Sequence, residues 1–125
     1  MRMIVVAPAA LFILTTSAVA GDVSGKGPNG GRLADAGNMH AEFVSKGVEL
    51  FVYTYDHDNK PVPSAGMSGK ATIQEKGKTR SAELKPQEAN RLVGKLEAPL
   101  EAGARVIVSL TPQGGKPVQA RYTAN

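Results

Sequence analysis

Hydrophobic and polar positions alternate along most of the chain from residue 31 onward. The clearest case is the segment 104–111, ARVIVSLT, in which Ala104, Val106, Val108 and Leu110 share one face. Alternation with a period of two is typical of a β-strand that buries one face. The same pattern predicts strands at about 31–35, 39–46, 48–55, 69–76, 78–85, 90–97, 104–111 and 117–123.

The segment 48–55 differs from the others because both of its faces are apolar or aromatic. Val48, Leu50 and Val52 lie on one side and Phe51, Tyr53 and Tyr55 on the other. A strand of this kind is expected in the centre of a sheet. The aromatic row is expected to pack at the core or its edge, and a platform for a sugar or a peptide is the alternative.

Short turns separate most of these strands and favour antiparallel neighbours. Glycine-containing turns divide the predicted strands at Lys46-Gly47, at 76–78 and at 113–116. The longer segment 56–69, DHDNKPVPSAGMSG, suits a Greek-key connection between two sheets. We therefore expect an all-β fold: a two-sheet antiparallel β-sandwich, immunoglobulin-like, with seven to eight short strands. A small β-barrel is the alternative.

The first 31 residues have a different character. Arg2, the apolar run 4–14 and the small-residue pattern Ala18-Val19-Ala20 are typical of a cleavable secretory signal peptide, which predicts a periplasmic protein. The run is too short and too interrupted to span a bilayer. Residues 21–31, GDVSGKGPNGG, are expected to form a flexible Gly-rich arm. A single β-sandwich domain is expected over 32–125.

Composition narrows the function classes. The chain has no cysteine, which excludes disulfides, thiolate metal sites and a cysteine nucleophile. Its 15 basic and 11 acidic residues give a net charge of +4, but they form no long run of basic residues, so no nucleic-acid binding is expected. No nucleophile elbow of the G-x-S-x-G type is present. The sequence therefore predicts a protein that is not an enzyme.

The candidate metal ligands surround the two histidines. His40 and Glu42 are two residues apart on a predicted strand and share a face. Asp56, His57 and Asp58 are consecutive in a predicted turn, where strict alternation is relaxed. These five side chains suit zinc, nickel, cobalt or copper. The alternatives are an exposed strand residue facing Glu42 for His40, and a turn capped by Asp58 and Asn59 that leaves His57 exposed.

One stretch of the chain carries a resemblance to known proteins. The segment 25–37, GKGPNGGRLADAG, followed by Met39-His40-Ala41-Glu42, resembles the opening of small exported bacterial proteins with an N-terminal HGPNGGRL-type motif. It is also similar to the N-terminal region of periplasmic adaptor subunits of heavy-metal efflux pumps. The histidine that often precedes Pro-Asn-Gly-Gly is replaced here by Gly27, so one metal ligand of that pattern is missing.

Two hypotheses of function follow. The resemblance implies an exported, non-enzymatic protein associated with heavy-metal binding or efflux, with efflux-pump components as partners. The alternative is an interaction module without a metal role, which binds another envelope protein through an edge strand or the aromatic face. Both hypotheses expect no membrane span once the signal peptide is removed.

Overall fold

The structure is a computed structural model and describes residues 25–124. This part of the chain forms strands joined by turns and loops, with no helix, and so contains no helix that could cross a membrane. The strands are β1 (Gly25–Lys26), β2 (Arg32–Ala36), β3 (Met39–Lys46), β4 (Glu49–Tyr55), β5 (Ser68–Glu75), β6 (Lys78–Gln87), β7 (Arg91–Lys95), β8 (Arg105–Thr111) and β9 (Val118–Thr123). The predicted signal peptide, residues 1–20, lies outside the described residues and stays a prediction.

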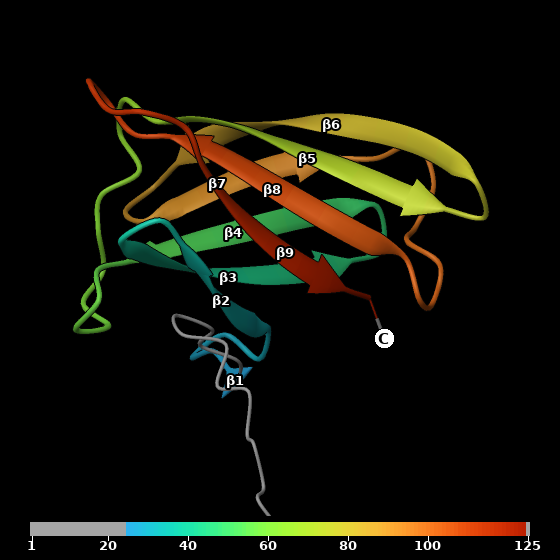
Figure 1. Cartoon of the computed structure of the whole chain (residues 1–125), viewed down its shortest axis with the longest axis horizontal. Coiled ribbons are helices and arrows are strands. Elements are labelled where there is room, and N and C mark those ends of the chain that lie inside the picture. Colours follow the sequence, from blue (N-terminus) through green and yellow to red (C-terminus); the bar gives the residue numbers. More distant parts are fainter. Residues whose placement is uncertain (1–24, 125) are drawn as a thin grey trace, which may run out of the picture.

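All neighbouring strands are antiparallel, in the order β1-β2-β3-β4-β7-β6-β5-β8-β9. β6 joins the two halves of this order, because residues 78–84 pair with β5 and residues 85–87 pair with β7. The sheet curls into a half-barrel, so that β2 and β9, far apart in the strand order, lie side by side (Figure 1). The expectation of an all-β fold is confirmed, while its assignment to a two-sheet, immunoglobulin-like sandwich stays a prediction.

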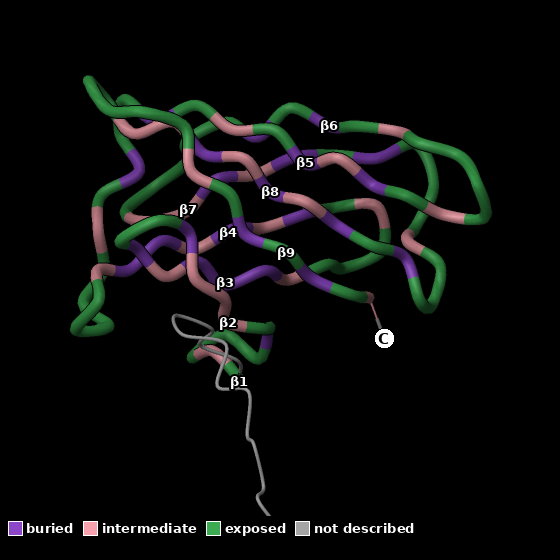
Figure 2. The backbone as a smooth tube through the Cα atoms, viewed as in Figure 1, coloured by how far each residue is buried: buried purple, intermediate pink, exposed green. Residues whose placement is uncertain are grey.

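The core fills the inside of the curl and is built from alternate residues of the strands. Leu50 and Val52 of β4, Ile73 of β5, and Val106 and Val108 of β8 are completely buried. Along β8, buried residues alternate with less buried ones, as Figure 2 shows. Burial of such side chains stabilises a fold by roughly 1.5–3 kcal/mol each, so these strands must pack on their inner faces.

The observed strands follow the predicted ones closely, with one addition. β4 lies between β3 and β7, as expected for a strand that is apolar on both faces. The connection 56–67 leads from β4 to β5, which are not neighbours in the sheet. β1, within the segment expected to be a Gly-rich arm, pairs with Arg32 and Leu33 of β2 and was not predicted.

Candidate functional site

Glu42 is buried on the outer face of β3, beneath the turn that follows β1. Its Oε2 accepts hydrogen bonds from the backbone N–H groups of Asn29 and Gly31, each at 2.8 Å. Its Oε1 accepts one from Asn29 Nδ2 at 2.9 Å and one from the Tyr55 hydroxyl at 3.2 Å. Both oxygens of this fully buried side chain are thus engaged with the protein, and Glu42 holds the turn 27–31 against the sheet.

The same turn explains the glycine at position 27. A Cβ added to Gly27 would lie 2.2 Å from Glu42 Cδ, far inside van der Waals contact. No side chain fits there while Glu42 is in place. Position 27 therefore has no room for a histidine, and this part of the chain contributes backbone donors to Glu42.

His40 lies two residues from Glu42 but has different partners. Its Nδ1 is 2.8 Å from Asn59 Oδ1, and its Nε2 is 3.3 Å from Asp35 Oδ1. These partners lie on opposite sides of the imidazole ring, and the side chain is 13% exposed. Since Glu42 bonds to the turn 27–31, the expected pair of His40 and Glu42 does not form a joint ligand set.

Asp56, His57 and Asp58 lie in the turn after β4, where they have separate roles. Asp56 Oδ1 accepts hydrogen bonds from the backbone N–H groups of Asp58 and Lys60, both at 2.9 Å. The bond from Lys60 is the main reason why the pKa of Asp56 is lowered. The His57 side chain is 77% exposed, and its Nε2 lies 3.8 Å from Asp58 Oδ2. Asp56 therefore stabilises the turn and His57 extends into solvent.

The five predicted ligands consequently fall into separate hydrogen-bonded arrangements. Within residues 25–124, no group of three or more histidine, aspartate or glutamate side chains is arranged to hold a metal ion. The nearest approach to a ligand pair is Asp35 with His40 Nε2. Sequence spacing alone did not reveal this pairing, because Asp35 is brought opposite His40 by the β2–β3 register.

The aromatic row of β4 lies on the outer face of the sheet, opposite the core face of Leu50 and Val52. Tyr55 is buried and donates to Glu42, whereas Phe51 and Tyr53 are half-buried. The guanidinium carbon of Arg91 lies 5.5 Å from the centre of the Phe51 ring. The row is therefore partly covered by the chain itself, which leaves little open aromatic surface for a sugar.

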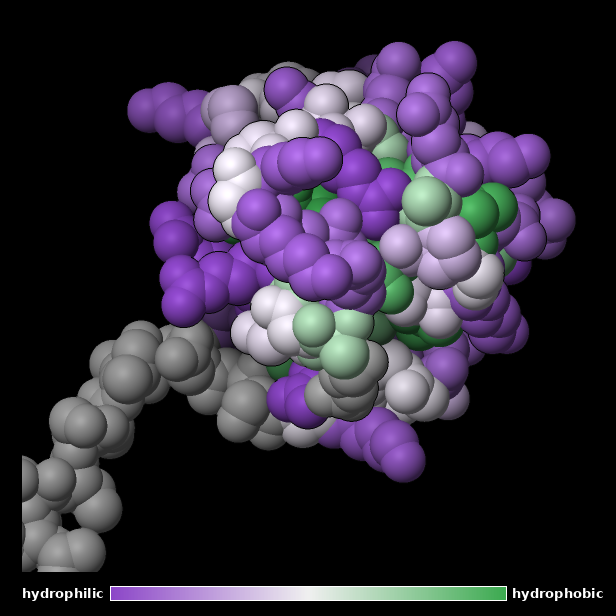
Figure 3. All heavy atoms as spheres, turned by 90° about the vertical axis from the view of Figure 1, so that its right-hand side faces the viewer, coloured by the Kyte–Doolittle hydropathy of each residue, from purple (hydrophilic) through white to green (hydrophobic). Residues whose placement is uncertain are grey.

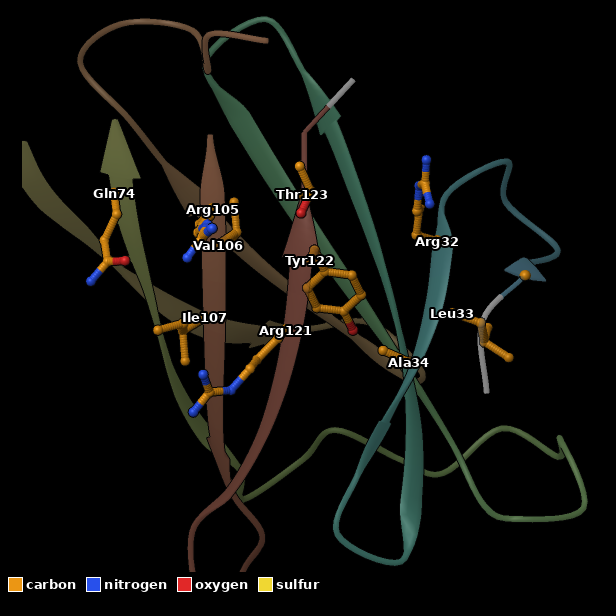
Figure 4. Close-up of a pocket in the computed structure, with 11 residues that line it drawn as sticks. Arg32, Leu33, Ala34, Gln74, Arg105, Val106, Ile107, Arg121, Tyr122 and Thr123 are labelled. Atoms are coloured by element: carbon orange, nitrogen blue, oxygen red, sulfur yellow. The ribbon is translucent and has the colours of Figure 1, made fainter. Parts of the chain in front are cut away.

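A different feature offers an open surface, namely the gap between the two ends of the curled sheet. β2 and β9 run antiparallel beside each other and touch at one end, where a Cβ on Gly37 would lie 2.5 Å from Val118 Cγ1. At the other end, near Arg32 and Thr123, they enclose a hollow of about 420 Å³ (Figure 4). We call this hollow the β2–β9 cleft.

Both strands and their neighbours line the β2–β9 cleft. From the first half of the sheet come Gly25, Arg32, Leu33 and Ala34. From the second half come Gln74 of β5, Arg105, Val106 and Ile107 of β8, and Arg121, Tyr122 and Thr123 of β9. Three of these residues are arginines and none is acidic. In Figure 4, Tyr122 lies between β9 and β2, and Arg121 extends toward Ile107.

Tyr122 joins the two ends of the sheet on the inner side of the cleft. Its hydroxyl donates to Ala41 O at 2.6 Å, and its ring stacks on Phe43 with centroids 5.2 Å apart. Burial, with a smaller contribution from the negative charge of Glu42, raises the pKa of Tyr122 well above its usual range. Tyr122 thus fixes β9 relative to β3, the neighbour of β2.

Sequence reasoning did not single out the cleft arginines. Arg105 and Arg121 occupy the polar positions of two alternating strands, which is ordinary for a solvated face. The register that places Arg121 opposite Ile107, and the curl that brings Arg32 to the same hollow, become visible only in the folded chain. A signal was present in the lack of acidic residues over 102–125, which contains three basic side chains.

Comparison of this chain with protein families, with curated proteins and with solved structures finds no match. The assignment of a function therefore depends on the geometry of the chain itself.

Proposed function

We propose that this chain is an exported, non-enzymatic binding module that takes an extended segment of another envelope protein in the β2–β9 cleft. The observation that carries the proposal is the edge of β9, which among residues 25–124 is the last strand of the sheet and borders an open hollow. Export rests on the predicted signal peptide, and N-terminal sequencing of the protein from a periplasmic fraction tests it.

The backbone of β9 offers hydrogen bonds to such a segment. Ala124 N donates to Ala104 O at 2.8 Å, so the backbone groups of Ala124 point toward the side of β8. Successive residues of a strand direct these groups to opposite edges. The N–H and C=O groups of Thr123 and Arg121 therefore point away from β8, toward the cleft. An unpaired edge of this kind is the usual template for strand addition.

The shape of the β2–β9 cleft limits how much chain can enter. Gly37 and Val118 close one end, so the bound segment pairs with the part of β9 near Arg121 and Thr123. A second hollow, lined by Phe43, Leu100 and Ala124 among others, shares Arg32 and Thr123 with the cleft. Seen from the end of the molecule shown in Figure 3, the surface is mostly hydrophilic, with apolar groups visible between polar ones. Mixed surfaces of this kind suit a reversible protein partner.

The finer fold assignment belongs to the same proposal. In a two-sheet, immunoglobulin-like sandwich, each sheet ends in two edge strands. Such edges can pair with a strand of a partner protein. The divided pairing of β6, between β5 and β7, supports two partly independent halves of the sheet.

Backbone NMR tests strand addition directly. The protein expressed from the full chain is titrated with a short peptide of alternating Gln and Val, blocked at both ends so that it carries no charge. We expect saturable shifts and slower hydrogen exchange at the amides of Arg121 and Thr123. Thr123→Pro removes one donor from the free edge without removing a donor to β8, and should abolish these shifts. Thr123→Val retains the donor and serves as the control. If the titration perturbs no β9 amide, the proposal is wrong.

A metal-binding function is the second candidate, because the resemblance to efflux adaptors implies it and Asp35 lies beside His40 Nε2. In this arrangement His40 and Asp35 would bind a zinc, nickel, cobalt or copper ion with water completing the ligand set. Titration of the protein with each ion, compared with a His40→Ala, His57→Ala double variant, tests it. Unchanged affinity in the double variant would exclude both histidines.

A further inference from the structure

Resting on the proposed binding function, we infer that the segment taken up by the β2–β9 cleft is acidic, and that Arg105 and Arg121 recognise its carboxylates. The two arginines line one hollow and come from neighbouring strands. A guanidinium group binds a carboxylate through two parallel hydrogen bonds, which gives it direction as well as charge.

The register of β8 and β9 places the two arginines close together on the outer face. Arg105 lies opposite Thr123, and Arg121 lies opposite Ile107, so the arginines are diagonal neighbours. Diagonal neighbours on one face are about 7–8 Å apart, within reach of one ligand. Both are exposed. Within the described part of the chain, no carboxylate forms an ion pair with either arginine, in contrast to Arg80 and Arg91.

The remainder of the lining strengthens the preference for negative charge. Among the described residues that line the cleft, none is an aspartate or a glutamate. A cavity lined by one sign of charge attracts ligands of the opposite sign and speeds their association. Leu33, Ala34 and Ile107 supply apolar surface between the charges.

These features favour an acidic peptide over a saccharide or a small anion. A saccharide would need an open aromatic surface for stacking, but Tyr122, the one aromatic side chain among the described residues that line the cleft, is 6% exposed. An extended peptide uses the free backbone groups of Arg121 and Thr123 as well as the arginine side chains. Side chains on one face of a strand recur at every second residue. The matching segment therefore carries Asp or Glu at alternate positions.

A set of matched peptides separates this inference from the binding function itself. The protein expressed from the full chain is titrated with blocked peptides of alternating Glu and Val, Gln and Val, or Lys and Val, and with inorganic phosphate alone. We expect the Glu-Val peptide to bind roughly tenfold more tightly than the Gln-Val peptide at low salt. The advantage should shrink as salt is added, and the Lys-Val peptide should bind most weakly.

Two double variants with equal changes of charge complete the test. Arg105→Gln with Arg121→Gln should remove the preference for Glu-Val over Gln-Val. Lys46→Gln with Lys95→Gln, on exposed positions of β3 and β7, should retain this preference.

Equal binding of the Glu-Val and Gln-Val peptides by the unaltered protein overturns the inference and leaves the binding function standing. Binding of no peptide overturns both. Phosphate binding as tight as that of the Glu-Val peptide overturns the inference of an acidic peptide in favour of a simple anion. Chemical shifts of the β9 amides that change with protein concentration in the absence of peptide overturn it in favour of a second copy of this chain.

Discussion

At the scale of single residues, the most informative side chain is Glu42. A buried carboxylate is costly unless hydrogen bonds satisfy it, and here four donors from the turn 27–31 and Tyr55 do so. Glu42→Gln keeps the shape of the side chain but places an NH₂ group, itself a donor, against the groups that donate to the carboxylate. We expect a loss of about 2–4 kcal/mol in the free energy of unfolding, measured by urea denaturation. Glu49→Gln, at an exposed position of β4, is the control and should change stability by less than about 0.5 kcal/mol.

Gly27 gives a second prediction at this scale, with a control two residues away. A Cβ at position 27 would meet Glu42 Cδ at 2.2 Å, whereas a Cβ at Gly25 would meet nothing within 4 Å. Gly27→Ala must displace Glu42 or the turn, so we expect a destabilisation of about 1–3 kcal/mol. Gly25→Ala should leave the unfolding midpoint nearly unchanged. Equal effects of the two substitutions would contradict the packing described for this turn.

At the scale of elements, the alternating pattern predicted most of the strands because each buries one face against a common core. The segment 104–111 shows this well, since Val106 and Val108 are buried while Arg105 is exposed. β1 was missed because it has two residues and no apolar pattern. The burial of Glu42 was missed for a related reason. Its side chain lies on the outer face of β3, but the turn 27–31, from the segment expected to be a flexible arm, covers it.

The connection between β7 and β8 is an element that two side chains hold in place. Arg80 binds Glu75 Oε1 through Nε at 2.9 Å and donates to the carbonyl oxygens of Ala98 and Pro99. Glu75 Oε2 accepts from Glu101 N at 2.7 Å, the main reason why the pKa of Glu75 is lowered. Arg80→Lys loses this forked geometry. We expect faster hydrogen exchange at the Glu101 amide with a small change in global stability, and unchanged exchange at Glu101 would contradict this role.

At the scale of the whole molecule, the curl of the sheet creates the β2–β9 cleft, and alternation within strands cannot predict it. The curl depends on which strands are neighbours and on contacts between strands distant in sequence. Tyr122 is the clearest example, since its hydroxyl reaches Ala41 O across 81 positions of the chain. The same residue was predicted only as part of a strand at 117–123. The sequence therefore indicates the inner face of each strand but not the contact between the two ends of the sheet.

Tyr122 also lowers the stability of the whole fold at alkaline pH. Its pKa is raised in the folded chain, mainly by burial, whereas in the unfolded chain it is expected near 10. Above about pH 10 the unfolded state therefore loses a proton that the folded state keeps, so stability falls as pH rises. The decline contributed by one such group is at most about 1.4 kcal/mol per pH unit.

Urea denaturation of the Tyr122→Phe variant across this pH range measures the contribution. The variant should lose about 1 kcal/mol at neutral pH, because the bond to Ala41 O is missing, but its stability should decline less steeply above pH 10. Some decline should remain, since burial and the nearby charge of Glu42 also raise the pKa of Tyr55. Tyr53→Phe removes a hydroxyl from the half-buried outer row and serves as the matched control for the substitution. If the free energy of unfolding of Tyr122→Phe declined as steeply above pH 10 as that of the unaltered protein, Tyr122 would not be the group responsible for the decline.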